Sequence, residues 1–187
     1  GLIMWAGSTT GPVAPPGTYQ VRMTVAGEKQ SRTFRLTKDP RSDATDADLQ
    51  AQFKLLIAIR DKTTEANNAV RLVRNMRSQV GDRVTRINGA SAAEFKKLSG
   101  EMMDDMSAGE QEVYQVKNQS SQDPLNYPIK LNNQIAALAG TVGSGEYRPT
   151  KQALEAYATL SKAIDEQVSA INTGMNSRLS RLNAILK

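Results

Sequence analysis

The hydrophobic period of this chain changes near residue 40, and this change constrains the fold more than any other feature. Up to that point apolar and polar residues alternate, which is typical of a β-strand with one apolar face. Beyond it apolar residues recur every three or four positions, which indicates amphipathic helices. Pro40 stands at the junction and ends the last strand, because proline cannot continue a hydrogen-bond ladder. We therefore divide the chain into residues 1–40 and residues 41–187.

The first part predicts a β-hairpin. One strand alternates over residues 19–25 and the second over residues 33–37, with Gly27 in the turn between them. Residues 2–5 are a candidate for a further strand. A hairpin alone is marginally stable in water, so its apolar face needs a cover. Three covers are open: strands upstream of this sequence, a partner chain, or the helices that follow.

The second part predicts three long helices and one short helix. Thr45 or Asp46 can cap the first helix, which should run to about Val80. We interpret Asp43, Asp46 and Asp48 as residues that stabilise this helix start, because a calcium loop of the EF-hand type would also need a Gly and a terminal Glu. The other helices are predicted at residues 92–118, residues 128–139 and from residue 150 nearly to residue 187. The expected fold class is mainly α: an antiparallel helical bundle preceded by a β-hairpin or partial β-sandwich.

The residue types exclude much catalytic chemistry. The chain contains no His and no Cys, so it lacks the side chains of tetrahedral zinc sites and of Ser-His-Asp or Cys-His nucleophile systems. The glycine-rich stretch "GTVGSGEY" matches neither a phosphate loop nor a dinucleotide fingerprint. The sequence therefore predicts no catalytic residue, no cofactor and no metal site. No apolar run approaches the ~20 residues of a membrane span, and an opening on "GLIMWAG" rather than on methionine indicates a fragment or processed piece.

Charged residues predict pairing between the first two long helices. The formal net charge of +5 permits nucleic-acid binding, but the basic residues 71–86 precede an acidic stretch at residues 101–112. A turn at residues 88–91 would fold one stretch against the other. No aromatic residues interleave with the arginines for base stacking, so we expect no nucleic-acid partner, and polyanion binding by residues 71–86 is kept as an alternative. The residues predicted to pair are Arg71, Arg74, Arg77, Asp104 and Asp105.

The stretch "SQDPLNYPIKLNN", residues 121–133, predicts a corner between helices. Asp123 precedes Pro124 and is biased out of helical geometry, while Pro128 suits the first turn of a new helix. The polar residues around this corner are open to three interpretations: a solvated face with helix caps, a buried polar network, or a ligand site. We predict a buried, rigid corner whose Asn side chains bond within the chain. The predicted network comprises Asn118, Asp123, Pro124, Asn126, Tyr127, Pro128, Asn132, Asn133, Arg60 and Asn67.

Several segments carry a family resemblance, notably "WAGSTTGPVAPPGTY", "KDPR" and "YQVKNQSSQDPLNYPIKLNNQIAAL". Over nearly all 187 residues the chain resembles the C-terminal region of large bacterial exported proteins with sortilin-like, Asp-box (BNR) β-propellers, often labelled glycosyl hydrolases. The resemblance implies that a propeller lies upstream and that residues 1–40 end an Ig-like β-sandwich module linking it to the helical tail. It also implies a periplasmic, secreted or cell-surface location, and it transfers no catalytic residue to this sequence.

We expect a non-catalytic accessory or interaction module that docks or assembles with a protein partner or with the upstream propeller of the same chain. The enzymatic alternative is a glycan-acting hydrolase, with its catalytic residues in the propeller or among carboxylates such as Asp104, Asp105 and Asp123. That alternative needs two carboxyl groups about 5–10 Å apart in a cleft.

Overall fold

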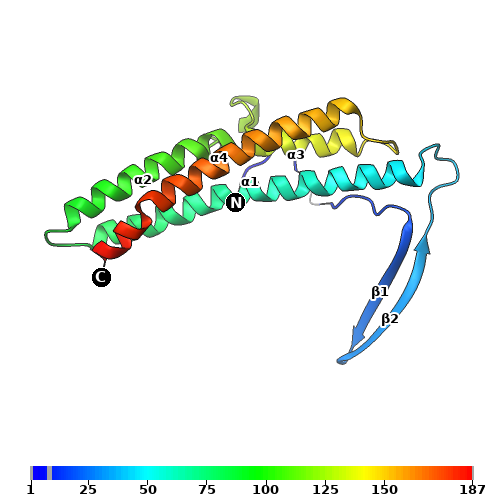
Figure 1. Ribbon diagram of the computed structural model, residues 1–187, viewed down its shortest axis with the longest axis horizontal. Coiled ribbons are helices and arrows are strands. Elements are labelled where there is room, and N and C mark those ends of the chain that lie inside the picture. The colour runs from blue at the N-terminus through cyan, green and yellow to red at the C-terminus, as the bar shows by residue number, and fades with distance from the viewer. Residues whose placement is uncertain (1, 8–9, 187) are drawn as a thin grey trace.

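The computed structural model describes residues 2–7 and 10–186, and it is a helical bundle preceded by a two-stranded antiparallel hairpin (Figure 1). The predicted fold class is confirmed. In chain order the elements are β1 (Gly17–Val25), β2 (Glu28–Leu36), α1 (Asp46–Arg86), α2 (Ala92–Val113), the 3-10 turn η1 (Asp123–Leu125), α3 (Leu131–Val142) and α4 (Lys151–Ile185).

The bundle is built along α1, whose 41 residues span about 60 Å. α1 and α4 both start near the hairpin end and run to the far end, whereas α2 and α3 run back in the opposite direction, one after the other (Figure 1). Two apolar clusters follow from this arrangement. One centres on Ile59, Ile135 and Ile164, and the other on Met102, Met106 and Ile171. The corner at residues 114–130 thus interrupts the return path of a bundle with three helical rods.

Helix starts follow local hydrogen-bonding chemistry. At the start of α1, the hydroxyl of Thr45 accepts the backbone N–H of Asp48 at 3.1 Å, and the Asp48 carboxylate accepts the N–H of Thr45 at 3.1 Å. This is a capping box, which satisfies two otherwise unpaired donors. Thr150 caps α4 by accepting the N–H of Ala153, without a reciprocal bond, since Ala153 has no polar side chain. Arg148 then joins the two starts, because its Nε lies 2.7 Å from Asp48 Oδ1. These bonds from Arg148 and Thr45 lower the pKa of Asp48 to about 2.

Four predicted helix boundaries were wrong: the end of α1, the end of α2 and both ends of α3, which finishes at Val142 instead of Ala139. α1 continues past Val80 to Arg86, because Val84 packs against the second apolar cluster and gives this last part of the helix a buried side. α2 ends at Val113 instead of Asn118. There Tyr114 leaves the helix with extended backbone, which turns its side chain into the first cluster, where it is 2% exposed.

The short helix α3 starts three residues later than Pro128, the start predicted from the sequence. Lys130 is extended, and the carbonyl of Pro128 accepts a bond from the Gln115 side chain at 2.9 Å instead of a helical N–H. Pro124 takes the role predicted for Pro128, since it lies in the first turn of η1. The prediction that Asp123 stays out of helical geometry was wrong, because Asp123 is the first residue of this 3-10 turn. The candidate strand at residues 2–5 was also wrong, because side chains and not a neighbouring strand bind its backbone.

The hairpin projects from the start of α1 away from the bundle (Figure 1). Its register runs from Gly17 opposite Leu36 to Val25 opposite Glu28. The two-residue turn has positive φ at Ala26 (50°) and at Gly27 (89°), as a type I′ turn requires. Within the described part of the chain, neither strand packs against a helix. Of the three covers that the sequence left open, the helices are therefore excluded.

Candidate functional site

One face of the hairpin carries six large apolar side chains that are partly or largely exposed to solvent. We call this set of side chains the hairpin face, and it consists of Tyr19, Val21, Met23, Val25, Phe34 and Leu36; the register places Glu28, Gln30 and Arg32 on the same side, opposite Val25, Met23 and Val21. The rings of Tyr19 and Phe34 stack with centroids 6.0 Å apart, which orders the end of the face nearest the bundle. Towards the turn nothing among the described residues covers it: Val21, Met23 and Val25 are 55%, 57% and 58% exposed. Such a row of large apolar side chains on one surface is typical of an interaction site.

A buried polar cluster holds the N-terminal segment, residues 2–6, against the middle of the bundle. We call it the asparagine clasp, and it consists of Asn67 of α1, Tyr114, and Asn132 and Asn133 of α3. Asn132 Nδ2 donates to Asn67 Oδ1 at 3.1 Å, and Asn132 is 0% exposed.

The clasp binds the backbone of the segment directly. Tyr114 Oη accepts the N–H of Ile3 at 3.1 Å, and Asn133 Oδ1 accepts the N–H of Ala6 at 2.8 Å. Between these two bonds the Met4 sulfur lies 3.4 Å from Asn132 Nδ2. The clasp thereby replaces the neighbouring strand that an extended segment usually needs.

The sequence-predicted network is split between this clasp and an exposed corner. The corner was predicted to be buried, and this is wrong: Leu125 is 70% exposed and Asn126 is exposed as well. Asp123 shapes the corner, because its Oδ2 accepts the N–H groups of Gln119 at 2.5 Å and Ser120 at 2.7 Å. These two bonds lower the pKa of Asp123.

The remaining predicted residues lie apart from the clasp. Arg60 points to solvent and pairs with Asp61 at 2.6 Å, so it belongs to no network. Asn118 is half-buried, and its Oδ1 meets no donor among the described residues. Tyr127 lies under the ammonium of Lys117, 5.6 Å from the ring centroid. The prediction missed Tyr114, and only its place directly before the corner in the sequence could have pointed to it.

The charge pairing joins other partners than those predicted. Arg74 and Arg77 both bind Glu110, at 3.1 Å and 2.6 Å, and Glu110 is only 2% exposed. The guanidinium of Arg74 also lies 4.8 Å from the centroid of the Tyr114 ring. The predicted register placed Arg74 beside Met102, about two helical turns from Glu110. A helical side chain points back towards the N-terminus of its own helix. In an antiparallel pair these two directions are opposite, so long side chains can meet although their Cα atoms lie at different heights along the bundle.

Asp105 pairs with Arg178 of α4 at 2.6 Å and not with Arg71. On a helix, residues 105 and 110 point about 140° apart, so one faces α4 while the other faces α1. Arg71 and Asp104 are exposed, and the structure gives neither an ion-pair partner within the described residues. Acidic residues of α2 therefore bind α1 on one side and α4 on the other. The sequence prediction paired α2 with α1 alone, so it could not assign Asp105 to α4.

Two shallow hollows are open to solvent. One lies between α1 and α4, where its carboxylates are engaged: Asp61 with Arg60, and Glu65 with Lys62 at 2.7 Å. The other lies on α1 beside Phe53 and Ile57. In residues 2–7 and 10–186, no group of three or more acidic residues is arranged to hold a metal ion. Over the same residues, no helix combines the length and apolar character needed to cross a bilayer.

Comparisons with protein-family models, with curated protein sequences and with solved structures give no match for this chain. The resemblance to the C-terminal region of sortilin-like propeller proteins, and the exported location that it implies, therefore stay predictions.

Proposed function

We propose that this chain is a non-catalytic interaction module that docks onto a β-structured protein through the hairpin face. The observation that carries the proposal is the exposure of this face together with the separation of both strands from every helix of the bundle. A two-stranded hairpin is marginal by itself, so the element gains stability when a partner covers it.

The apolar area is large enough to support docking. Burying a Val, Leu, Met or Phe side chain completely contributes about 1.5–3 kcal/mol, and most side chains of the hairpin face start about half exposed. Covering all six would contribute on the order of 5 kcal/mol, before the entropy of association is subtracted. A β-structured partner fits best, because a sheet face can interdigitate with a second sheet at ~10 Å spacing.

The resemblance noted in the sequence suggests where such a partner occurs. We propose that the chain belongs to an exported β-propeller protein and that the hairpin docks on the propeller or on the module that links the two. Any glycan hydrolysis by such a protein would then reside in its propeller. In support, Asp105 is bound by Arg178 and Asp123 by backbone amides, so neither is a free acid or base.

The bundle would act as the rigid support of the hairpin. Lys38 fixes the chain after β2, with its ammonium 2.6 Å from the carbonyl of Ser42 and 2.7 Å from that of Ala44. Before β1, Gln50 of α1 donates to the carbonyl of Pro16 at 3.2 Å. Gln50 thus ties the root of β1 to α1, Lys38 braces the loop between β2 and α1, and the free length of the hairpin carries the docking face.

Polyanion binding receives less support from the structure. Two of the arginines in residues 71–86, Arg74 and Arg77, are bound to the buried carboxylate of Glu110. No aromatic residue lies within residues 71–86 to stack on a base beside the remaining basic residues.

Site-specific photo-crosslinking in the native host tests the proposal. A benzophenone side chain at Met23 probes the hairpin face, and the same group at Ser31 is the matched control, since both positions are exposed but Ser31 lies on the opposite face and on β2. We expect a crosslink to a β-structured protein or propeller module from position 23 only. In the purified chain, the amides of residues 17–36 should exchange with solvent much faster than those of α1. Equal crosslinking from both positions, or hairpin amides as protected as α1, would contradict the proposal.

A further inference from the structure

The outer edges of the hairpin, one along β1 and one along β2, differ in the charge that they carry. This difference supports an inference that rests on the proposed function. We propose that β1 is the edge that pairs with the docking partner, and that the partner supplies an extended strand in which acidic residues alternate with apolar ones. The proposal follows from the hairpin register, from the distribution of charge between the two strands and from the net charge of the hairpin.

The register determines which backbone groups are free. A two-residue turn makes Val25 and Glu28 a hydrogen-bonded pair, and such pairs alternate with non-hydrogen-bonded pairs along an antiparallel ladder. Residues of the hairpin face therefore turn their N–H and C=O groups inwards, to the other strand. The outward N–H and C=O groups belong to Thr18, Gln20, Arg22 and Thr24 on β1, and to Lys29, Ser31, Thr33 and Arg35 on β2. Each edge is a row of unpaired groups that can accept a further strand.

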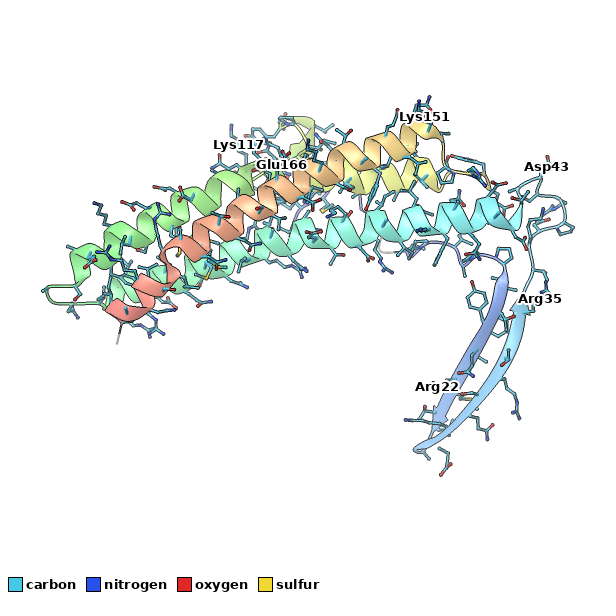
Figure 2. All side chains as sticks on the ribbon, in the orientation of Figure 1. Arg22, Arg35, Asp43, Lys117, Lys151 and Glu166 are labelled. Atoms are coloured by element: carbon cyan, nitrogen blue, oxygen red, sulfur yellow. The ribbon has the colours of Figure 1, made fainter. Side chains whose placement is uncertain are left out.

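The β1 edge is the more receptive of the two. It carries two threonines, which favour strands, and a single charge at Arg22. The β2 edge carries Lys29 and Arg35, and Arg32 adds a third positive charge on the same strand. Positive residues on an edge strand are a common device against strand addition. Figure 2 shows Arg22 and Arg35 on the projecting hairpin, clear of the helices, so no helix obstructs either strand at these positions.

Charge defines the partner strand. The hairpin holds four basic residues, Arg22, Lys29, Arg32 and Arg35, against the single acidic residue Glu28, which gives it a net charge of +3. A second copy of this chain would bring an equal positive charge to the interface, so the hairpin favours an acidic partner over self-association. A strand added to β1 must alternate in step with it. Its apolar residues then extend the hairpin face beside Val21 and Met23, and its acidic residues lie on the other face beside Arg22.

Peptide binding to the full-length chain tests this inference. The probes are two fluorescein-labelled, capped peptides, Thr-Val-Glu-Val-Glu-Val-Thr and the same sequence with Lys in place of Glu, and binding is followed by fluorescence anisotropy. The variants are Gln20→Pro, which deletes one outward N–H of β1, and Thr33→Pro, which deletes the outward N–H at the opposite position of β2. Both prolines leave the inner ladder intact and the charge unchanged.

We expect the acidic peptide to bind the native chain, to bind Gln20→Pro at least tenfold more weakly, and to bind Thr33→Pro within about twofold of the native value. The Lys peptide should not bind. Equal weakening by both prolines, binding of both peptides alike, or no saturable binding of the acidic peptide would each overturn the proposal.

Cysteine pairing keeps the test decisive if a proline unfolds the hairpin, because the native chain contains no cysteine. With oxidised glutathione as the oxidant, the acidic peptide with its first Glu replaced by Cys should form a disulfide faster with Gln20→Cys than with Thr33→Cys, and equal rates would refute β1 pairing. This result is independent of the crosslinking at Met23. A crosslink there without selective pairing at position 20 would leave the docking function standing and refute the edge assignment alone.

Discussion

A close contact between α2 and α4 makes Gly109 an informative position in the bundle. A Cβ atom added at Gly109 would lie 2.6 Å from Ile171 Cγ1, 3.1 Å from Ile171 Cδ1 and 3.4 Å from the carbonyl oxygen of Gln167. Ile171 is 1% exposed, and its Cγ1 is next to the branch point of the side chain, so it has little room to move. Gly100 lies in the same helix, but a Cβ added there meets no atom within 4 Å.

Replacing each of the two glycines by alanine should change the free energy of unfolding by very different amounts, or with opposite sign. In an open helical position, Gly→Ala adds about 1 kcal/mol to the free energy of unfolding, and Gly100→Ala should show this gain. Gly109→Ala receives the same helix-propensity gain but overpacks a buried contact, which costs about 1–3 kcal/mol. Gly109→Ala should therefore be about 1–3 kcal/mol less stable than Gly100→Ala, which corresponds to a melting temperature lower by roughly 2–12 °C.

Urea denaturation followed by circular dichroism measures this difference, and a double-mutant cycle identifies its cause. Ile171→Ala removes the two closest atoms, Cγ1 and Cδ1, and leaves only the Gln167 carbonyl oxygen at 3.4 Å, an ordinary contact distance, so the deficit of Gly109→Ala relative to Gly100→Ala should disappear in that background. The reasoning is refuted if Gly109→Ala is as stable as Gly100→Ala. It is also refuted if the deficit persists without the Ile171 side chain, since the contact would then not be its source.

Three further predictions concern polar contacts. The pKa of Asp48, about 2 in the folded chain, lies below the ordinary value of about 3.9 in an unfolded chain; its stabilisation is therefore present in full above about pH 4 and is lost as the pH falls through about 2. Asp48→Asn should lower the melting temperature at neutral pH and have progressively less effect as the pH falls below about 2, and a difference independent of pH would contradict this. Tyr114→Phe deletes the acceptor of the Ile3 N–H and should cost about 1 kcal/mol in urea denaturation, whereas an unchanged midpoint would mean that the clasp does not hold the segment. Arg77→Met leaves the buried Glu110 with fewer partners and should cost about 1–2 kcal/mol, less than a fully buried pair because Arg77 is half exposed; Glu110→Gln in the Arg77→Met background should recover part of this loss.

The corner illustrates how far local sequence signals reach. The proline and aspartate of "SQDPLNYPIKLNN" correctly indicated a break between helices, because their effects on the backbone are local. They could not indicate burial, which depends on whether another element covers the corner. The elements of the bundle pass beneath it, so Leu125 is exposed although it is apolar.

The asparagine clasp shows that a local pattern can identify polar residues that need partners without identifying those partners. Asn67, Asn132 and Asn133 were selected because polar residues near apolar stripes require partners when buried. Two of those partners, the N–H of Ala6 and the sulfur of Met4, come from the opposite end of the chain. No local pattern specifies a contact across more than 100 residues, so the sequence pointed to these residues but not to what they bind.

The sequence by itself determined where strands and helices form, because period, caps and turn residues act within a few positions of each other. Thr45 caps α1, Gly27 closes the hairpin, and the change of period near residue 40 separates the two parts. Tertiary structure decided which helix each face of α2 meets, and so gave Asp105 to α4 and Glu110 to α1. It also decided that the hairpin projects instead of folding back on the bundle. Packing between distant elements fixes these outcomes, and that packing leaves the hairpin face exposed to solvent.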